Sequence, residues 1–102
     1  MNTLTTEIQV ARAQHVTISE DSLTVDLDDG RTISVPLAWY PRLLQSTSKE
    51  RSNWRLIGKG EGIHWSDLDE DISIENLLGA KRSGESQRSF KRWQEERSSR
   101  NK

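Results

Sequence analysis

The sequence predicts an α+β fold: a small antiparallel β-meander with one apolar face covered by two or three short helices, plus a short second β-hairpin. Apolar and polar residues alternate from Val16 to Val35, which is typical of strands with one buried face. Pro36 cannot donate to a central strand ladder, and Pro41 suits the first turn of a helix. The two prolines therefore mark the passage from sheet to helix.

Composition predicts one small domain with a basic tail. The 102 residues fit a single hydrophobic core, which typically holds ~100 to 150 residues. From Lys81 onward the chain has eight Lys and Arg against three Asp and Glu, whereas the preceding part has seven against thirteen. We expect a flexible N-terminus over residues 1–10, an α+β domain over 11–80, and a basic tail over 81–102 that is disordered or conditionally helical.

Cysteine content and hydropathy exclude several classes of protein. The chain has no cysteine, so neither a disulfide framework nor a thiolate zinc site can form. No apolar run approaches the ~18 residues of a membrane span, and the N-terminus lacks the basic-then-apolar pattern of a signal peptide. We expect a cytoplasmic protein that binds no membrane and needs no cofactor.

The turn around Asp29 and Gly30 determines which residues share a face of the meander. A two-residue loop would put the apolar residues of the flanking strands on opposite faces. A three-residue loop over 28–30 instead aligns them and gives Gly30 the left-handed position of a bulged turn. The predicted apolar face then holds Val16, Ile18, Leu23, Val25, Leu27, Ile33 and Val35, and the polar face His15, Thr17, Thr24, Asp26, Thr32 and Ser34.

Short elements are predicted after Pro41. A helix from Pro41 carries Leu43 and Leu44, and Thr47 with Glu50 forms a capping box for a second helical turn. Residues 54–57 suggest a fourth strand, and residues 63–65 a short returning strand after a glycine-rich turn. Ser73 can cap a last helix over 74–78, which Gly79 closes.

Three blocks of the sequence form a recognisable combination: the turn at 29–31 with Ile33, the segment 35–43 (Val-Pro-Leu-Ala-Trp-Tyr-Pro-Arg-Leu), and residues 53–55 through 62–65 to 68–73. Together these blocks resemble a widespread bacterial family of unknown function, domain family 2442. The resemblance implies a small α+β domain, often encoded beside a second small protein in an arrangement that looks like a toxin–antitoxin pair. Some members carry a helix-turn-helix domain after it, but residues 81–102 are too short and too polar for one.

The densest group of candidate ligand or acid–base residues follows the returning strand: His64, Asp67, Asp69, Glu70 and Asp71. The alternating acids resemble a calcium loop, but an EF-hand needs Gly where Ile72 stands and Glu where Leu78 stands. Acids ahead of a helix also stabilise its positive end. A partner-facing acidic edge is the third interpretation, and it is the one we carry forward.

Other catalytic and nucleotide-binding patterns fail on spacing. The glycines at 58, 60 and 62 resemble a phosphate loop, but they do not open a helix, and Glu61 would repel a phosphate. The serines lie in loops or in the tail, with no recognisable nucleophile elbow. An enzyme centred on His64 and Asp67 would need a concave pocket beside them. We therefore expect a protein that is not an enzyme.

The aromatic residues have two interpretations. In a domain this small Trp39, Tyr40, Trp54 and Trp65 serve most often as core or corner packing. With so few aliphatic residues, Trp39 or Trp65 could instead be exposed among charged neighbours as an interface anchor. Candidate partner-binding residues are therefore Trp39, Tyr40, His64, Trp65, Asp67, Asp69, Glu70 and Asp71.

The tail mixes cations with two aromatic residues. Nucleic-acid-binding segments combine phosphate-neutralising cations with stacking groups in this way. Phe90 and Trp93 also have a spacing that suits a short helix in a partner's groove, and the remaining interpretation is a solvated tail. Candidate nucleic-acid-binding residues are Arg88, Lys91, Arg92, Trp93 and Arg97.

Two functions follow from these observations. The first is a non-enzymatic protein-binding module, such as the antitoxin-like or regulatory member of a bacterial two-gene pair, whose partner would be a small protein encoded by an adjacent gene. The alternative is a nucleic-acid-binding accessory protein that acts through the basic C-terminal tail.

Overall fold

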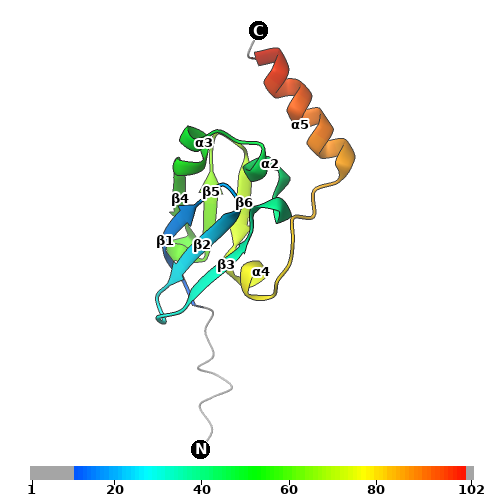
Figure 1. Ribbon diagram of the computed structural model, residues 1–102. Coiled ribbons are helices and arrows are strands. Elements are labelled where there is room, and N and C mark those ends of the chain that lie inside the picture. The colour runs from blue at the N-terminus through cyan, green and yellow to red at the C-terminus, as the bar shows by residue number, and fades with distance from the viewer. Residues whose placement is uncertain (1–10, 101–102) are drawn as a thin grey trace, which may run out of the picture.

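The computed structural model describes residues 11–100 and shows two small antiparallel sheets with short helices around them (Figure 1). The predicted α+β fold is confirmed, and the flexible N-terminus expected over residues 1–10 lies outside the described residues. In chain order the elements are β1 (Ala13–Ile18), β2 (Ser22–Leu27), β3 (Thr32–Pro36), the 3₁₀ turn η1 (Leu37–Trp39), α2 (Pro41–Leu44), α3 (Ser48–Ser52), β4 (Trp54–Ile57), the 3₁₀ turn η2 (Gly58–Gly60), β5 (Gly62–Trp65), β6 (Glu70–Ser73), α4 (Ile74–Leu78) and α5 (Gln87–Arg100).

The first sheet has the register that the turn argument predicts. Its order is β1-β2-β3, with Val25 opposite Ile33 and Leu23 opposite Val35. Leu27 N–H donates to the Arg31 carbonyl at 2.8 Å, which leaves a three-residue loop between them, and Gly30 has φ +93°. A side chain at that φ would be strained, so glycine is needed there. The predicted apolar face points into the core.

The second sheet contains the predicted hairpin, β4–β5, and adds a third strand to it. Its order is β4-β5-β6, so a third strand, Glu70–Ser73, joins the two that the sequence indicates. The acids at 70 and 71 therefore belong to a strand and are separated from α4, which begins at Ile74 behind the Ser73 cap. A segment of four residues that starts with two acids is too short to show the alternation of apolar and polar residues that predicts a strand. Its conformation is decided instead by pairing with β5.

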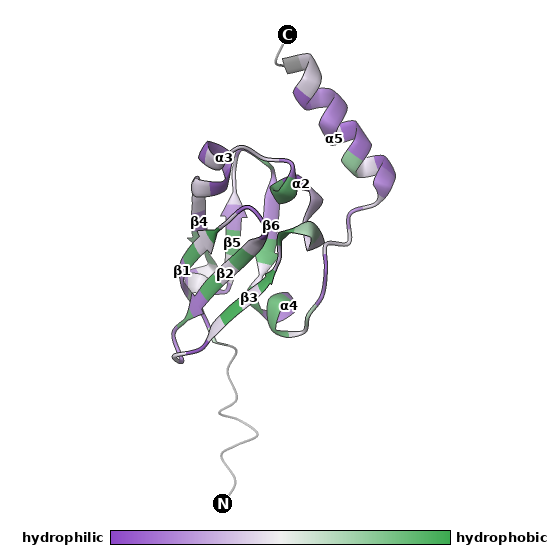
Figure 2. Cartoon of the chain, viewed as in Figure 1, coloured by the Kyte–Doolittle hydropathy of each residue, from purple (hydrophilic) through white to green (hydrophobic). Residues whose placement is uncertain are grey.

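Both sheets contribute to one core. The register of the second sheet puts Trp54, Trp65 and Glu70 level with one another on its inner face, next to Leu56, Ile63 and Ile72. Leu23 and Val25 of β2 and Ile63 and Trp65 of β5 are fully buried in the same hydrophobic cluster. The second sheet therefore covers the first sheet together with the short helices. Figure 2 shows apolar residues, in green, on strands of both sheets.

The capping signals correctly predict the short helices. Pro41 is the first residue of α2, and Thr47 and Glu50 form both hydrogen bonds of the capping box of α3. The Ser73 side chain accepts from the Asn76 N–H at the start of α4, and Gly79 ends that helix. These helices hold the corners between the sheets.

Residues 87–100, for which the sequence allowed disorder or a conditional helix, form α5. Figure 1 shows this helix beside α2 and beyond the ends of the sheets. It is mostly hydrophilic (Figure 2), and its Trp93 is buried. No helix among residues 11–100 is both long enough and apolar enough to cross a membrane.

Candidate partner-binding site

Arg42 connects three segments that are distant in the sequence. Pro41 begins α2 and thereby places the Arg42 side chain at the junction between the sheets and the C-terminal segment. Its guanidinium donates to both carboxylate oxygens of Glu85 at 2.5 to 3.0 Å, and its Nη1 donates to the carbonyls of Leu68 at 3.0 Å and Asp69 at 3.3 Å. Arg42 therefore ties α2 to the β5–β6 turn and to the approach to α5.

The ion pair of Arg42 sets the charge state of its partner. Burial acts to raise the pKa of Glu85, but hydrogen bonds from Arg42 and from the Ser89 hydroxyl outweigh it and lower that pKa. The Glu85 side chain is only 10% exposed, so the pair is screened from water. Glu85 is thus a charged residue that anchors the chain to Arg42 immediately before α5.

Trp93 anchors α5 to the domain. Its side chain is 5% exposed, with Phe90 stacked against it at a ring-centroid distance of 5.6 Å. The guanidinium carbons of Arg97 and Arg42 lie 4.7 and 5.4 Å from the indole centroid. Arg97 also pairs with both carboxylate oxygens of Glu50, at 2.6 and 3.0 Å.

A hollow separates α5 from the β5–β6 turn. Its volume is about 300 Å³. Asp67 and Asp69 on one side and Arg92 and Glu96 on the other are exposed, and none of them takes part in an ion pair among the described residues. We call this hollow the acidic-turn cleft; its lining is Arg42, Ser66, Asp67, Leu68, Asp69, Ser89, Arg92, Trp93 and Glu96.

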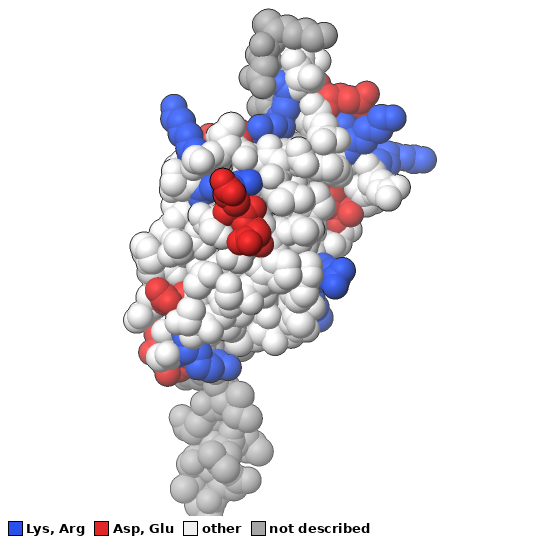
Figure 3. Space-filling view, viewed as in Figure 1, with Lys and Arg blue, Asp and Glu red and all other residues white. Residues whose placement is uncertain are grey.

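The acidic-turn cleft brings together two groups that the sequence suggested separately. Asp67 and Asp69 come from the candidate acidic edge, and Arg92 and Trp93 come from the candidate nucleic-acid-binding tail. Figure 3 shows Lys and Arg atoms interspersed with Asp and Glu atoms around α5. The site therefore presents both signs of charge.

The other three members of the candidate acidic edge lie elsewhere. His64 Nδ1 and Asp71 Oδ1 hydrogen-bond across β5 and β6 on the outer face of the second sheet. Glu70 points to the inner face, so it is not part of an exposed acidic edge. Among residues 11–100, no group of three or more His, Asp or Glu side chains is arranged to hold a metal ion.

Several candidate anchors are in the core and not on the surface. Trp65 is fully buried, and its indole N–H donates to the Arg51 carbonyl at 3.0 Å; Tyr40 is 3% exposed. Neither can contact a partner while the domain is folded. Trp39 is half-buried, with the Arg82 guanidinium 5.0 Å from its ring centroid. Among the candidate partner-binding residues Trp39, Tyr40 and Trp65, only Trp39 is partly exposed.

The candidate nucleic-acid-binding residues of the tail also divide into exposed residues and residues that are buried or paired. Arg88, Lys91 and Arg92 are exposed on α5. Trp93 is buried and Arg97 is paired with Glu50, so in this conformation Trp93 cannot stack on a base and Arg97 is not free to neutralise a phosphate. The indole packs instead against Phe90, Arg42 and Arg97 within the protein.

The sequence interpretation missed Arg42 and Glu85 as site residues. Their ion pair joins residues 43 positions apart, so no local spacing reveals it. Arg42 did lie inside a block shared with the family, which was the available signal. Glu85 stood among Ser and Gly residues in a segment interpreted as tail.

Comparisons with known proteins identify the fold family. One solved structure, of a protein of unknown function from Rhodospirillum rubrum, is 25% identical, with a TM-score of 0.65 over 76% of this chain and 95% of that one. Another, of an uncharacterised protein from Chromobacterium violaceum, is 19% identical, with a TM-score of 0.62 over 72% of this chain and 69% of that one. No curated protein matches the chain. The family model for a protein of unknown function, DUF2442, matches residues 13–83, and the chain therefore belongs to the DUF2442 family.

Proposed function

We propose that this chain is a non-enzymatic protein-binding module that contacts its partner at the acidic-turn cleft. One observation carries the proposal: exposed charges of both signs line a single hollow without pairing with each other. Such charges are available to a partner, and complementary charges steer association and fix its register.

A rigid frame around the cleft supports this function. Arg42 binds the backbone of the β5–β6 turn, and Arg97 and Trp93 hold α5 against the domain. Charged side chains on preorganised elements lose less entropy on binding than the same groups on mobile segments. The cleft therefore offers fixed charge positions to a partner surface.

The partner that we propose is a small protein encoded by an adjacent gene, so that this chain would be the antitoxin-like or regulatory member of a bacterial pair acting in the cytoplasm. The cleft requires that partner to present both acidic and basic groups, because Asp67 and Asp69 face Arg92 across it. A partner with a single strong charge would be repelled by part of the lining.

The test is binding between the purified chain and the product of the neighbouring gene. We expect a complex at micromolar concentration, with Arg92→Glu raising its Kd by about tenfold or more, which corresponds to roughly 1.4 kcal/mol. Arg88→Glu is the matched control, because Arg88 is exposed on the same helix and does not line the cleft. Absence of a complex, or equal effects of the two variants, would contradict this function.

Nucleic-acid binding through α5 is the alternative, and the exposure of Arg88, Lys91 and Arg92 favours it. Those cations make the two functions distinguishable. Nucleic acid would lose affinity in Arg88→Glu as well as in Arg92→Glu, and three neutralised duplex phosphates would give a slope of about −2.7 for log K against log salt. Glu95 and Glu96 are exposed on the same helix, and their negative charges would repel a phosphate backbone.

A further inference from the structure

The free edge of β1 carries backbone groups that point away from its own sheet. Ser19 N–H donates to the Ser22 carbonyl at 2.9 Å, which sets the alternation of the β1–β2 ladder. In an antiparallel pair, alternate residues bond to the neighbouring strand, so Thr17 faces β2 while Val16 and Ile18 direct their N–H and C=O groups outward. Within residues 11–100, neither the strand pairings nor the loop hydrogen bonds reach those outward groups.

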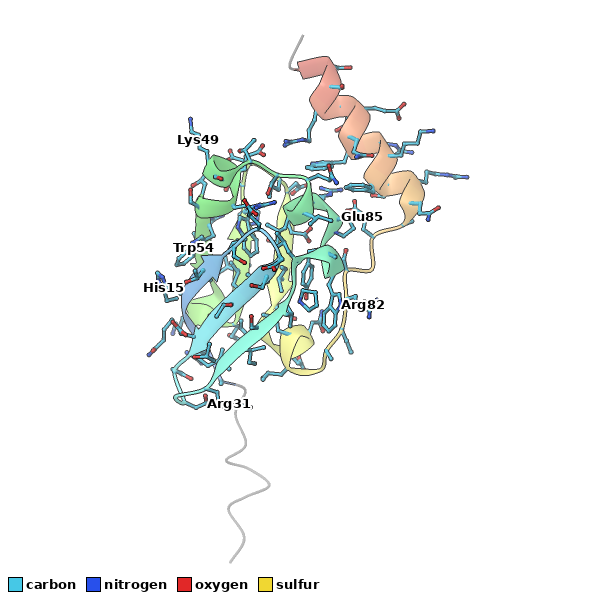
Figure 4. The ribbon with its side chains drawn as sticks, in the orientation of Figure 1. His15, Arg31, Lys49, Trp54, Arg82 and Glu85 are labelled. Carbon is cyan, nitrogen blue, oxygen red and sulfur yellow. The ribbon has the colours of Figure 1, made fainter. Side chains whose placement is uncertain are left out.

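A groove runs beside this edge. It has a volume of about 360 Å³ and lies between residues 15–20 and a wall formed by α3 and the start of β4. Trp54 meets His15 edge to face at a ring-centroid distance of 5.6 Å, and Figure 4 shows the two side chains next to each other. We call this space the β1 groove; its wall is Ser48, Arg51, Ser52 and Trp54.

The β1 edge has neither a proline nor a charged side chain, which are two of the features that protect natural edge strands. A β-bulge is another such feature, and the register irregularity of β1 lies between Ala13 and His15, ahead of the outward groups of Val16 and Ile18. Strand β3 ends in Pro36, β4 contains Arg55, and β6 begins with Glu70 and Asp71. Residues 13–18 contain no Pro, Asp, Glu, Lys or Arg. Of the four edges in the described sheets, β1 is therefore the one best suited to accept another strand.

The wall of the groove carries a positive charge, and the acidic residue of the groove lining, Glu20, forms no ion pair with it among the described residues. Arg51 donates to the carbonyls of Leu43 and Leu44 at 3.1 and 3.0 Å and to the Ser46 hydroxyl at 3.2 Å. Its Nη1 also donates to the Ser19 carbonyl, just after β1, at 3.5 Å. All of these acceptors are neutral, and Arg51 takes part in no ion pair among the described residues. A guanidinium has five N–H donors, so donors remain for a carboxylate.

We propose that the β1 groove binds an extended segment of a protein partner, with an Asp or Glu side chain next to Arg51, as a fourth strand on the first sheet. Main-chain hydrogen bonds to Val16 and Ile18 would supply affinity, and contacts between the wall and the side chains of the bound segment would supply specificity. The proposal shares with the proposed function only the assumption of a protein partner, since the groove and the acidic-turn cleft have no lining residue in common.

The probe is a random-peptide library displayed on phage and selected on the full chain. We expect selected peptides with alternating apolar residues and at least one Asp or Glu. Ser52→Glu adds a negative charge at an exposed wall position and should raise their Kd by about tenfold or more. Ser34→Glu places the same charge on the far edge strand, β3, and should leave the Kd unchanged.

Backbone pairing is tested separately. Ile18→Pro removes an outward N–H that the ladder does not use, whereas Ser34→Pro removes the equivalent outward N–H on β3 and serves as the control. N-methylation along a selected peptide should abolish binding at alternate positions, a readout that does not depend on how well the proline variants fold. Failure to enrich any peptide, or equal binding by wild type and Ser52→Glu, would overturn the proposal.

The proposal for the acidic-turn cleft and the proposal for the β1 groove can each fail without the other. A complex with the neighbouring protein that is lost in Arg92→Glu but retained in Ser52→Glu leaves the proposed function intact and assigns that partner to the cleft. If no such complex forms, the proposed function fails, while peptide selection still decides whether the β1 groove binds an extended chain.

Discussion

Glu70 is a carboxylate in an apolar position. It lies on the inner face of β6, level with Trp65, and its Oε1 has no hydrogen-bond partner among the described residues. Burial raises the pKa of Glu70 to about 7, and the negative charge of Glu85 adds to this effect, while Arg42 opposes it. The neighbouring carboxylates Asp69 and Asp71 raise the pKa further. Glu70 is thus a local source of instability at neutral pH.

The stability of the protein should therefore depend on the protonation of Glu70. Its folded-state pKa is higher than the unfolded value of 4.5, so the folded state binds more protons between pH 4.5 and 7 and stability falls as pH rises through that window. We expect Glu70→Gln to raise the free energy of unfolding at pH 8 by about 1 to 2 kcal/mol, after allowance for partial exposure. Urea unfolding at a series of pH values measures the difference.

Below pH 4.5 the difference between Glu70→Gln and wild type should vanish, because both side chains are then neutral. Glu75→Gln, at an exposed position of α4, controls for the loss of one negative charge. A Glu70→Gln variant that gains no stability at pH 8 would show that the carboxylate is satisfied in solution.

At the scale of elements, α5 depends on a few side chains for its position. Its contacts with the domain centre on Trp93, the ion pair of Arg97 with Glu50, and the anchor of Glu85 before it. Glu50 has two functions, since its carboxylate also accepts from the Thr47 N–H in the capping box of α3. The docking of α5 and the start of α3 are thereby connected through one side chain.

Trp93→Ala should release α5 without unfolding the sheets. Loss of a buried indole costs about 3 to 5 kcal/mol in a core, and here that cost exceeds what the remaining ion pairs supply. Hydrogen exchange should show amides 87–100 losing protection while those of β2 keep theirs. Gln94→Ala, at the adjacent exposed position, should change neither the protection of amides 87–100 nor that of the β2 amides. Unchanged protection of α5 in Trp93→Ala would mean that other contacts dock the helix.

At the scale of the whole molecule, the two sheets should unfold together. Leu23 of β2 and Ile63 of β5 are both fully buried in one cluster. We expect Leu23→Ala and Ile63→Ala each to lower the free energy of unfolding by about 2 to 4 kcal/mol, and each to reduce amide protection in both sheets. Thr17→Ala, on the outer face of β1, is the control. Loss of protection confined to the mutated sheet would indicate two separate folding units.

Much of the local structure could be predicted from the sequence. The register of the first sheet followed from side-chain parity and one glycine, and the short helices followed from Pro41, Thr47 and Ser73. The site was predicted less completely. Asp67, Asp69 and Arg92 were candidates for separate reasons, but nothing in their spacing placed them across one hollow.

By itself, the sequence determined the fold class, the faces of the first sheet and the family, because turns, caps and period-2 alternation act between residues that are close in the chain. Only the tertiary structure decided that Glu70 points inward, that Arg42 reaches Glu85, that Trp93 is buried and that one edge of β1 stays open. Those outcomes depend on contacts between distant segments, such as the ion pair of Glu50 with Arg97, which lie 47 positions apart. Local propensity carries no information about them, since they arise when the sheets and helices pack.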